Sequence, residues 1–164
     1  MKLKLLFSIV LIAVAAANFA AQKREFVGYE YKGVVYGATL PNGAKDLGGG
    51  LLSDENYGVS RFSRGKNFML WLEKINSRDA DGIPSWAVKD VLIFSKPKKN
   101  REFLFSHSSG CRQMGEENLD LIVMAEFLPK TKTYKVINAW RANIAGEKFE
   151  KTSKKGIVCQ YDAP

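Results

Sequence analysis

Alternation of apolar and polar residues along Asn118–Phe127 constrains the fold more than any other feature of this sequence. Every second residue from Leu119 to Phe127 is apolar, and Asp120 and Glu126 lie between them. Side chains of a β-strand alternate between its two faces, so the pattern predicts a strand with one apolar face. No stretch of the chain has the pattern of a long, capped amphipathic helix. The sequence therefore predicts a mainly β fold.

Five further stretches are predicted to contain strands on the same grounds. They are residues 26–40, with one or two strands, 68–75, for which a short helix is the alternative, 86–94, 133–144 and 156–161. Two of them carry apolar sets that we expect to share one face each: Trp86, Val88, Leu92 and Phe94 in the first, and Tyr134, Val136, Trp140 and Ala142 in the second.

Turn-forming residues separate the predicted strands. Pro41–Gly50 predicts a loop that contains an Asn42-Gly43 turn, and Asp79–Pro84 predicts a tight turn. Strands of this length and spacing favour antiparallel pairing. We expect a β-sandwich or a curved antiparallel sheet, and an α+β arrangement with one short helix is the alternative.

The first 21 residues have the order of a secretory signal peptide. Lys2 and Lys4 precede an apolar run from Leu5 to Ala17, and small residues follow. A spanning helix needs about 20 apolar residues, more than this run contains, so a retained membrane anchor is the less favoured alternative. Cleavage is predicted between residues 17 and 21, which leaves one disulfide-linked β-rich domain over residues 22–164 in the periplasm or outside the cell.

Cys111 and Cys159 both fall in the part of the chain that is expected to enter an oxidising compartment. Disulfides form and persist in such compartments, so the two cysteines are predicted to pair across 48 positions. With both thiols oxidised, a cysteine nucleophile is excluded.

The stretch Ser106–Gly115 raises the question of a nucleophile site, because it holds the only histidine, His107, beside Ser108 and Ser109. A serine nucleophile needs a base within hydrogen-bond reach, but neighbouring side chains of an extended chain point to opposite faces. The G-x-S-x-G motif is also missing around Ser109. We therefore predict no catalytic residue, and a secreted hydrolase with a site around His107 is the alternative.

Metal sites and cofactors are not predicted either. A single histidine and the lack of a C-x-x-C pair exclude the usual zinc sites. Asp79, Asp81 and Gly82 match part of an EF-hand loop, but Ser77 and Val88 occupy its first and last ligand positions. A tight turn between two strands explains these residues better.

Positive charge is the remaining guide to function. The chain has 25 basic and 17 acidic residues, and loss of Lys2 and Lys4 with the signal peptide lowers the formal charge from +8 to +6. Such a surplus favours anionic partners. The basic residues cluster in two segments, and the candidate binding residues are Lys96, Lys98, Lys99, Arg101, Lys154 and Lys155. If the fold joins the two segments, they form one anion-binding surface.

Together these features favour a small exported binding domain without catalytic activity. We expect it to recognise an anionic envelope component or a partner protein, as inhibitor and immunity proteins do. Nucleic acid is not expected, because secretion argues against it and Phe103, Phe105 and Phe149 alternate as core residues do. A structural subunit of the cell envelope is a further alternative, which self-association would distinguish.

Overall fold

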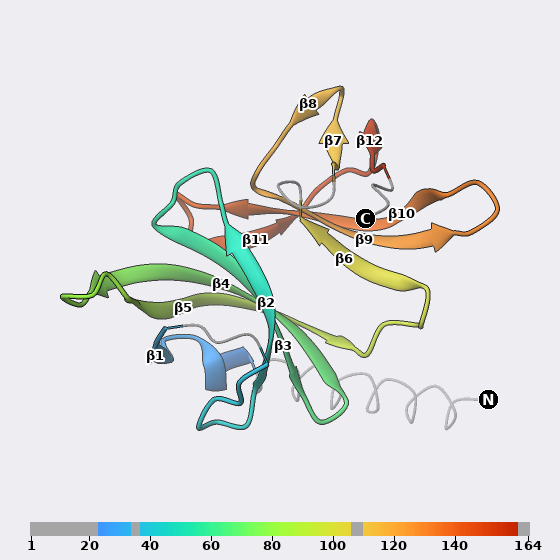
Figure 1. The fold of residues 1–164 in the computed structure, drawn as a ribbon. Helices are drawn as coiled ribbons and strands as arrows, with labels where there is room; N and C mark the ends of the chain where they lie inside the picture. Colours follow the sequence, from blue (N-terminus) through green and yellow to red (C-terminus); the bar gives the residue numbers. More distant parts are fainter. Residues whose placement is uncertain (1–22, 34–36, 106–109, 161–164) are drawn as a thin grey trace, which may run out of the picture.

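A computed structural model describes residues 23–33, 37–105 and 110–160 of the chain (Figure 1). As the sequence predicts, the described part is mainly β, and all of its strand pairs are antiparallel. Residues 23–26 form a single helical turn. The strands form two larger sheets, named A and B below, and a small sheet C. Together the antiparallel strands curl as a half-barrel, which agrees with the predicted curved antiparallel sheet.

Sheet A has five strands in the order β1-β5-β4-β3-β2. They are β1 (Glu30–Lys32), β2 (Lys45–Leu51), β3 (Tyr57–Arg64), β4 (Asn67–Arg78) and β5 (Pro84–Ser95). Strands β2 to β5 follow one another in space as in sequence, because short turns reverse the chain between them. The predicted turn after β4 is present, and the Asp79 carboxylate accepts hydrogen bonds from the N–H groups of Asp81 at 3.0 Å and Ile83 at 2.8 Å.

Sheet B has four strands in the order β11-β10-β9-β6, and sheet C has three in the order β12-β7-β8. The strands of sheet B are β6 (Arg101–Phe105), β9 (Leu121–Leu128), β10 (Thr133–Asn143) and β11 (Lys148–Lys151). Those of sheet C are β7 (Arg112–Gln113), β8 (Glu116–Glu117) and β12 (Ile157–Val158).

The central core lies between sheets A and B. The side chains of β3 and β4 in sheet A meet those of all four strands of sheet B there. Phe103, Phe105 and Phe149 are buried in this core, which confirms the prediction that they are core residues, and Trp140 is buried with them. The outer faces of both sheets are also covered, that of sheet A by Phe26, Ala44 and neighbouring residues.

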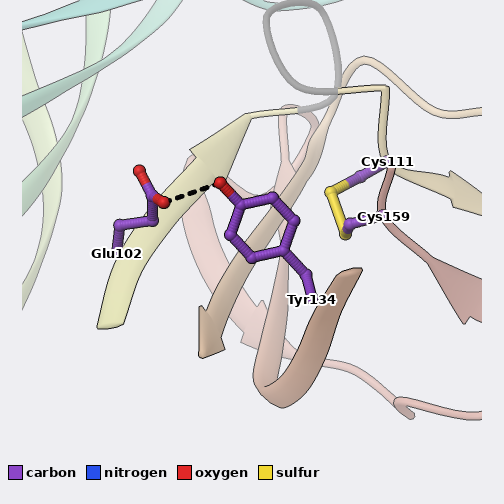
Figure 2. The surroundings of a disulfide bond; sticks show 4 residues. All are labelled: Glu102, Cys111, Tyr134 and Cys159. Carbon is purple, nitrogen blue, oxygen red and sulfur yellow. Dashed lines mark hydrogen bonds between the residues drawn. A yellow bond between two sulfur atoms is a disulfide. The ribbon is translucent and has the colours of Figure 1, made fainter. Parts of the chain in front are cut away.

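The predicted disulfide between Cys111 and Cys159 covers the outer face of sheet B. Both cysteines are buried, and they pack with apolar side chains of β9 and β10. Cys111 precedes β7 and Cys159 follows β12, so the bridge cross-links these two paired strands of sheet C, and its buried side chains pack against sheet B. Figure 2 shows the bridge beside Tyr134, whose hydroxyl donates a hydrogen bond to Glu102 at 2.8 Å.

Sheets A and B are joined along one side by the buried carboxylate of Asp90 in β5. Asp90 accepts a hydrogen bond from the backbone N–H of Phe149 in β11 at 2.8 Å and pairs with Lys23 at 2.6 Å. Because β11 is an edge strand of sheet B, the hydrogen bond to Phe149 attaches that edge to β5. The half-barrel is therefore closed on its β5–β11 side.

Asp90→Ala is expected to lower the free energy of unfolding by about 1.5–3 kcal/mol, because it removes charge-assisted hydrogen bonds and leaves the N–H of Phe149 without an acceptor. Urea denaturation followed by tryptophan fluorescence measures the change. Asp81→Ala is the matched control, since Asp81 is an exposed turn residue and its loss is expected to cost less than about 0.5 kcal/mol. Equal stability of the two variants would contradict the role given to Asp90.

One prediction about the N-terminal half is wrong. Residues 26–40 contain one strand, β1, among their described positions, within the predicted one or two, but the glycine-rich part of Pro41–Gly50 is the strand β2 instead of a loop. Glycine is needed at Gly49, because a Cβ there would lie 2.3 Å from the carbonyl oxygen of Val59 in β3. The glycines thus permit a close approach of two strands.

The predicted common faces of β5 and β10 are also wrong, because each strand contains an irregularity. In β5 the pairing shifts between Asp90 and Val88, so Val88 packs on the outer face while Leu92 packs toward the central core. In β10 the shift between Val136 and Asn138 has the same effect. Val136 therefore packs on the disulfide side, and residues beyond the shift, such as Trp140, pack in the central core.

Candidate functional site

Exposed lysines occupy three connections on one side of the molecule, where the β5–β6 loop runs between the β3–β4 turn and the β9–β10 turn (Figure 1). This surface, called the basic end, consists of Lys66, Lys96, Lys98, Lys99, Lys130 and Lys132. The first belongs to the β3–β4 turn, the next three to the β5–β6 loop and the last two to the β9–β10 turn. None of the six forms an ion pair with a residue of the described ranges. Their charges therefore face solvent.

Two backbone hydrogen bonds hold these connections together. The N–H of Lys96 donates to the carbonyl of Lys66 at 3.3 Å, which joins the β5–β6 loop to the β3–β4 turn. The N–H of Phe127 donates to the carbonyl of Asn100 at 2.9 Å, which aligns the same loop with the end of β9. The β9–β10 turn starts just after that strand, so it lies at the same end of sheet B.

Arg101, the fourth candidate predicted in the β5–β6 loop, is half-buried and already paired. Its Nε donates to the Glu126 carboxylate at 2.8 Å. This hydrogen bond holds the pKa of Glu126 below its ordinary value. The positive charge of Arg101 is balanced there, so the excess charge of the basic end comes from the lysines.

Lys154 and Lys155 are exposed in the connection between β11 and β12. This connection follows β11, at the edge of sheet B opposite to β6, into which the other basic segment leads. The fold therefore does not bring the two predicted segments together. It joins Lys96, Lys98 and Lys99 to Lys66, Lys130 and Lys132 instead. Sequence reasoning missed these three, because their proximity depends on which turns share one end of the sheets.

Glu73 in β4 is a buried carboxyl group, and its pKa is the most strongly shifted among the carboxyl groups of the described residues. Tyr31 donates to Glu73 Oε1 at 2.6 Å and Ser60 to Oε2 at 2.7 Å. Glu73 is 1% exposed. Burial raises its pKa to about 8, assisted by the nearby negative charge of Asp46 and opposed by the two hydrogen bonds. Burial also raises the pKa of Tyr31.

This arrangement holds a serine hydroxyl against a carboxyl group, yet it is unsuited to catalysis. A carboxyl group with a pKa of about 8 is mostly protonated at neutral pH, so Glu73 is a poor base for Ser60. Both side chains are also buried, which leaves no access for a substrate. We interpret the cluster of Tyr31, Ser60 and Glu73 as a structural hydrogen-bond network between β1, β3 and β4.

A second polar cluster surrounds Glu147, which lines a surface hollow of about 600 Å³ with Tyr57 and Lys74. Glu147 accepts a hydrogen bond from Tyr57 at 2.9 Å and pairs with Lys74 and Lys89 at 3.2 Å each. Partial burial raises the pKa of Glu147, but these donors outweigh it and the pKa falls below its ordinary value. The carboxylate is thus neutralised by its own neighbours.

The remaining sequence candidates give no further site. His107, Ser108 and Ser109 lie outside the described residues. Within the described ranges no group of three or more His, Cys, Asp or Glu side chains could hold a metal ion, and no helix is long and apolar enough to cross a membrane. Comparison with known proteins found no match to a family model, a curated protein or a solved structure.

Proposed function

We propose that this protein is an exported, non-catalytic binding domain whose basic end recognises an anionic partner in the periplasm or at the cell envelope. The observation that carries the proposal is that three connections on one side hold six exposed lysines, none of which forms an ion pair with a described residue. An anionic partner is attracted by such a surface and can bind its lysines without breaking an existing ion pair.

Export is supported by two features. The order of basic, apolar and small residues over residues 1–21 is typical of a signal peptide. The Cys111–Cys159 disulfide is of a kind that persists in oxidising compartments. Together they favour an extracytoplasmic partner, such as an acidic protein or an anionic envelope polymer.

Charge reversal at the basic end tests the proposal. Lys98→Glu with Lys99→Glu is expected to weaken binding to immobilised poly-L-glutamate and heparin at least about tenfold, or about 1.4 kcal/mol. Binding by the unaltered protein is expected to weaken as salt is raised, because the Debye length falls from about 8 Å at 0.15 M to about 3 Å at 1 M.

The matched control is Lys154→Glu with Lys155→Glu, which changes the net charge equally on another part of the surface. It is expected to retain most of the affinity. If both double variants lose the same affinity, binding follows net charge alone and the basic end has no special role. Binding that does not respond to salt would contradict an electrostatic partner.

A further inference from the structure

The half-barrel has an open side opposite to its β5–β11 closure. Sheet A ends there at β2 and sheet B ends at β6, and in the described part of the chain these two edge strands do not pair with each other or with another strand. Unpaired edges of this kind present rows of N–H and C=O groups that can pair with an additional strand.

The free edge of β2 can be assigned from the hydrogen-bond pattern. The N–H of Leu52 bonds to the carbonyl of Tyr57, and partners alternate along an antiparallel ladder. Gly50 therefore directs its backbone groups to β3, whereas those of Gly49 and Leu51 point away from it. Residues 37–39 cover the beginning of β2 through Asp46, and no described residue pairs with Gly49 or Leu51 on this edge.

The free edge of β6 is assigned in the same way, from the hydrogen bonds between β6 and β9. Because the carbonyl of Asn100 bonds to Phe127, the residues of β6 that pair with β9 are Glu102 and Leu104. Phe103, between them, directs its backbone N–H and C=O away from β9. Both edges of the open side thus carry backbone groups that suit another strand.

Arg61 of β3 spans the space between these edges. Its Nε donates to the carbonyl of Gly48 in β2 at 3.2 Å, and its guanidinium lies over the ring of Phe105 in β6, 5.4 Å from the centroid. These contacts orient the half-buried guanidinium, while its two terminal nitrogens have no acceptor among the described residues. A carboxylate is the group that a guanidinium fork binds best in a protein partner.

We propose that an extended, acidic segment of a partner protein adds to the β2 edge on this open side. Its backbone pairs with Gly49 and Leu51, and one of its carboxylates binds Arg61. This inference rests on the proposed function and specifies a polypeptide, because the free edge offers alternating donors and acceptors that match a peptide backbone.

A pair of peptides separates strand addition from simple charge attraction. Poly-L-glutamate is compared with the same peptide methylated at every backbone nitrogen, which keeps the carboxylates but lacks N–H donors. We expect the unmethylated peptide to bind at least about tenfold more tightly, or about 1.4 kcal/mol. Its binding is also expected to slow hydrogen exchange at the amides of Gly49 and Leu51.

Variants on the protein give a second test. Leu51→Pro removes the outward N–H while leaving the hydrogen bonds to β3 intact, so the fold is expected to persist. It is expected to lose peptide binding about tenfold relative to Leu51→Ala, which keeps the N–H. Arg61→Gln is expected to weaken peptide binding comparably and Arg61→Lys less, with thermal melting as the check that each variant is folded.

The outcomes distinguish this inference from the proposed function. If both peptides bind equally, or Leu51→Pro binds as well as Leu51→Ala, strand addition is wrong while the basic end still has an anionic ligand. Binding of heparin without binding of poly-L-glutamate would identify a polyanionic glycan and also overturn strand addition. If neither polymer binds the unaltered protein, both proposals fail.

Discussion

Replacing both Cys111 and Cys159 by alanine is expected to lower the free energy of unfolding by about 4 kcal/mol. The bridge closes a loop of 48 positions, and a cross-link of that span restricts the unfolded chain. For a domain of this size the loss corresponds to roughly 8–16 °C in melting temperature. Since domains are stable by only about 5–15 kcal/mol, this bond is among the largest single contributions to the fold.

The position of the disulfide also predicts where the variant loosens first. Sheet C contains only two-residue strands, and the buried bridge cross-links β7 to β12 where they pack against sheet B. We expect faster hydrogen exchange at Arg112, Gln113 and Ile157 in the variant, with smaller changes in β4. Calorimetry measures the global loss and exchange mass spectrometry its location.

A second variant shows how much stability is lost when apolar packing is reduced but the disulfide is kept. Val123→Ala removes apolar volume from the same buried cluster without opening the loop, and it is expected to cost less than the double cysteine variant. Two titratable thiols in native, untreated protein, or an unchanged melting temperature in the double variant, would refute the role assigned to the bridge.

The strands were predictable where the two-residue period is uninterrupted. Leu121, Val123 and Ala125 do share one face, as the sequence indicates. Their neighbour Ile122 is buried too, on the opposite face, because sheet B has a core on each side. An alternating pattern therefore identified the strand but understated its burial.

Faces were not predictable where a strand is irregular. One extra residue in β5 and one in β10 shift the pairing, and every side chain beyond the shift changes face. Lys89 and Ile137 lie at these shifts. Both are residue types that also occur in regular strands, so the sequence does not mark the irregularities. The glycines of β2 were misread for a different reason. Glycine is common in turns, so the segment was predicted as a loop, but it forms a strand whose backbone closely approaches that of β3.

The candidate site was predictable only in part. Lys96, Lys98 and Lys99 stand out as a charge run, but their neighbours Lys66 and Lys130 come from separate turns. Strand order decides which turns meet, and that order depends on pairings between residues far apart in sequence. Glu73 did leave a local signal, since it falls in phase with Met69 and Trp71 in an apolar strand and so faces the same buried side.

Stability of the protein is expected to decrease as the pH rises from about 4.5 to about 8, because of Glu73. In the folded state its pKa is raised from 4.5 to about 8, chiefly by burial, so the folded protein holds this proton more tightly than the unfolded chain does. The resulting stabilisation is complete below pH 4.5 and is lost as the pH approaches 8. At about 1.4 kcal/mol per pKa unit, the loss is on the order of several kcal/mol.

Glu73→Gln isolates this contribution, because glutamine is nearly isosteric and does not titrate. Its free energy of unfolding, from urea denaturation at pH 5, 6, 7 and 8, is expected to vary less with pH than that of the unaltered protein. Contributions from the other titratable groups are common to both proteins and cancel in the difference. The amide oxygen can still accept from Tyr31 or Ser60, so the variant is expected to fold. Parallel pH profiles for the two proteins would show that Glu73 is ionised in the fold, and Tyr31 and Ser60 would then be the donors that stabilise a buried charge.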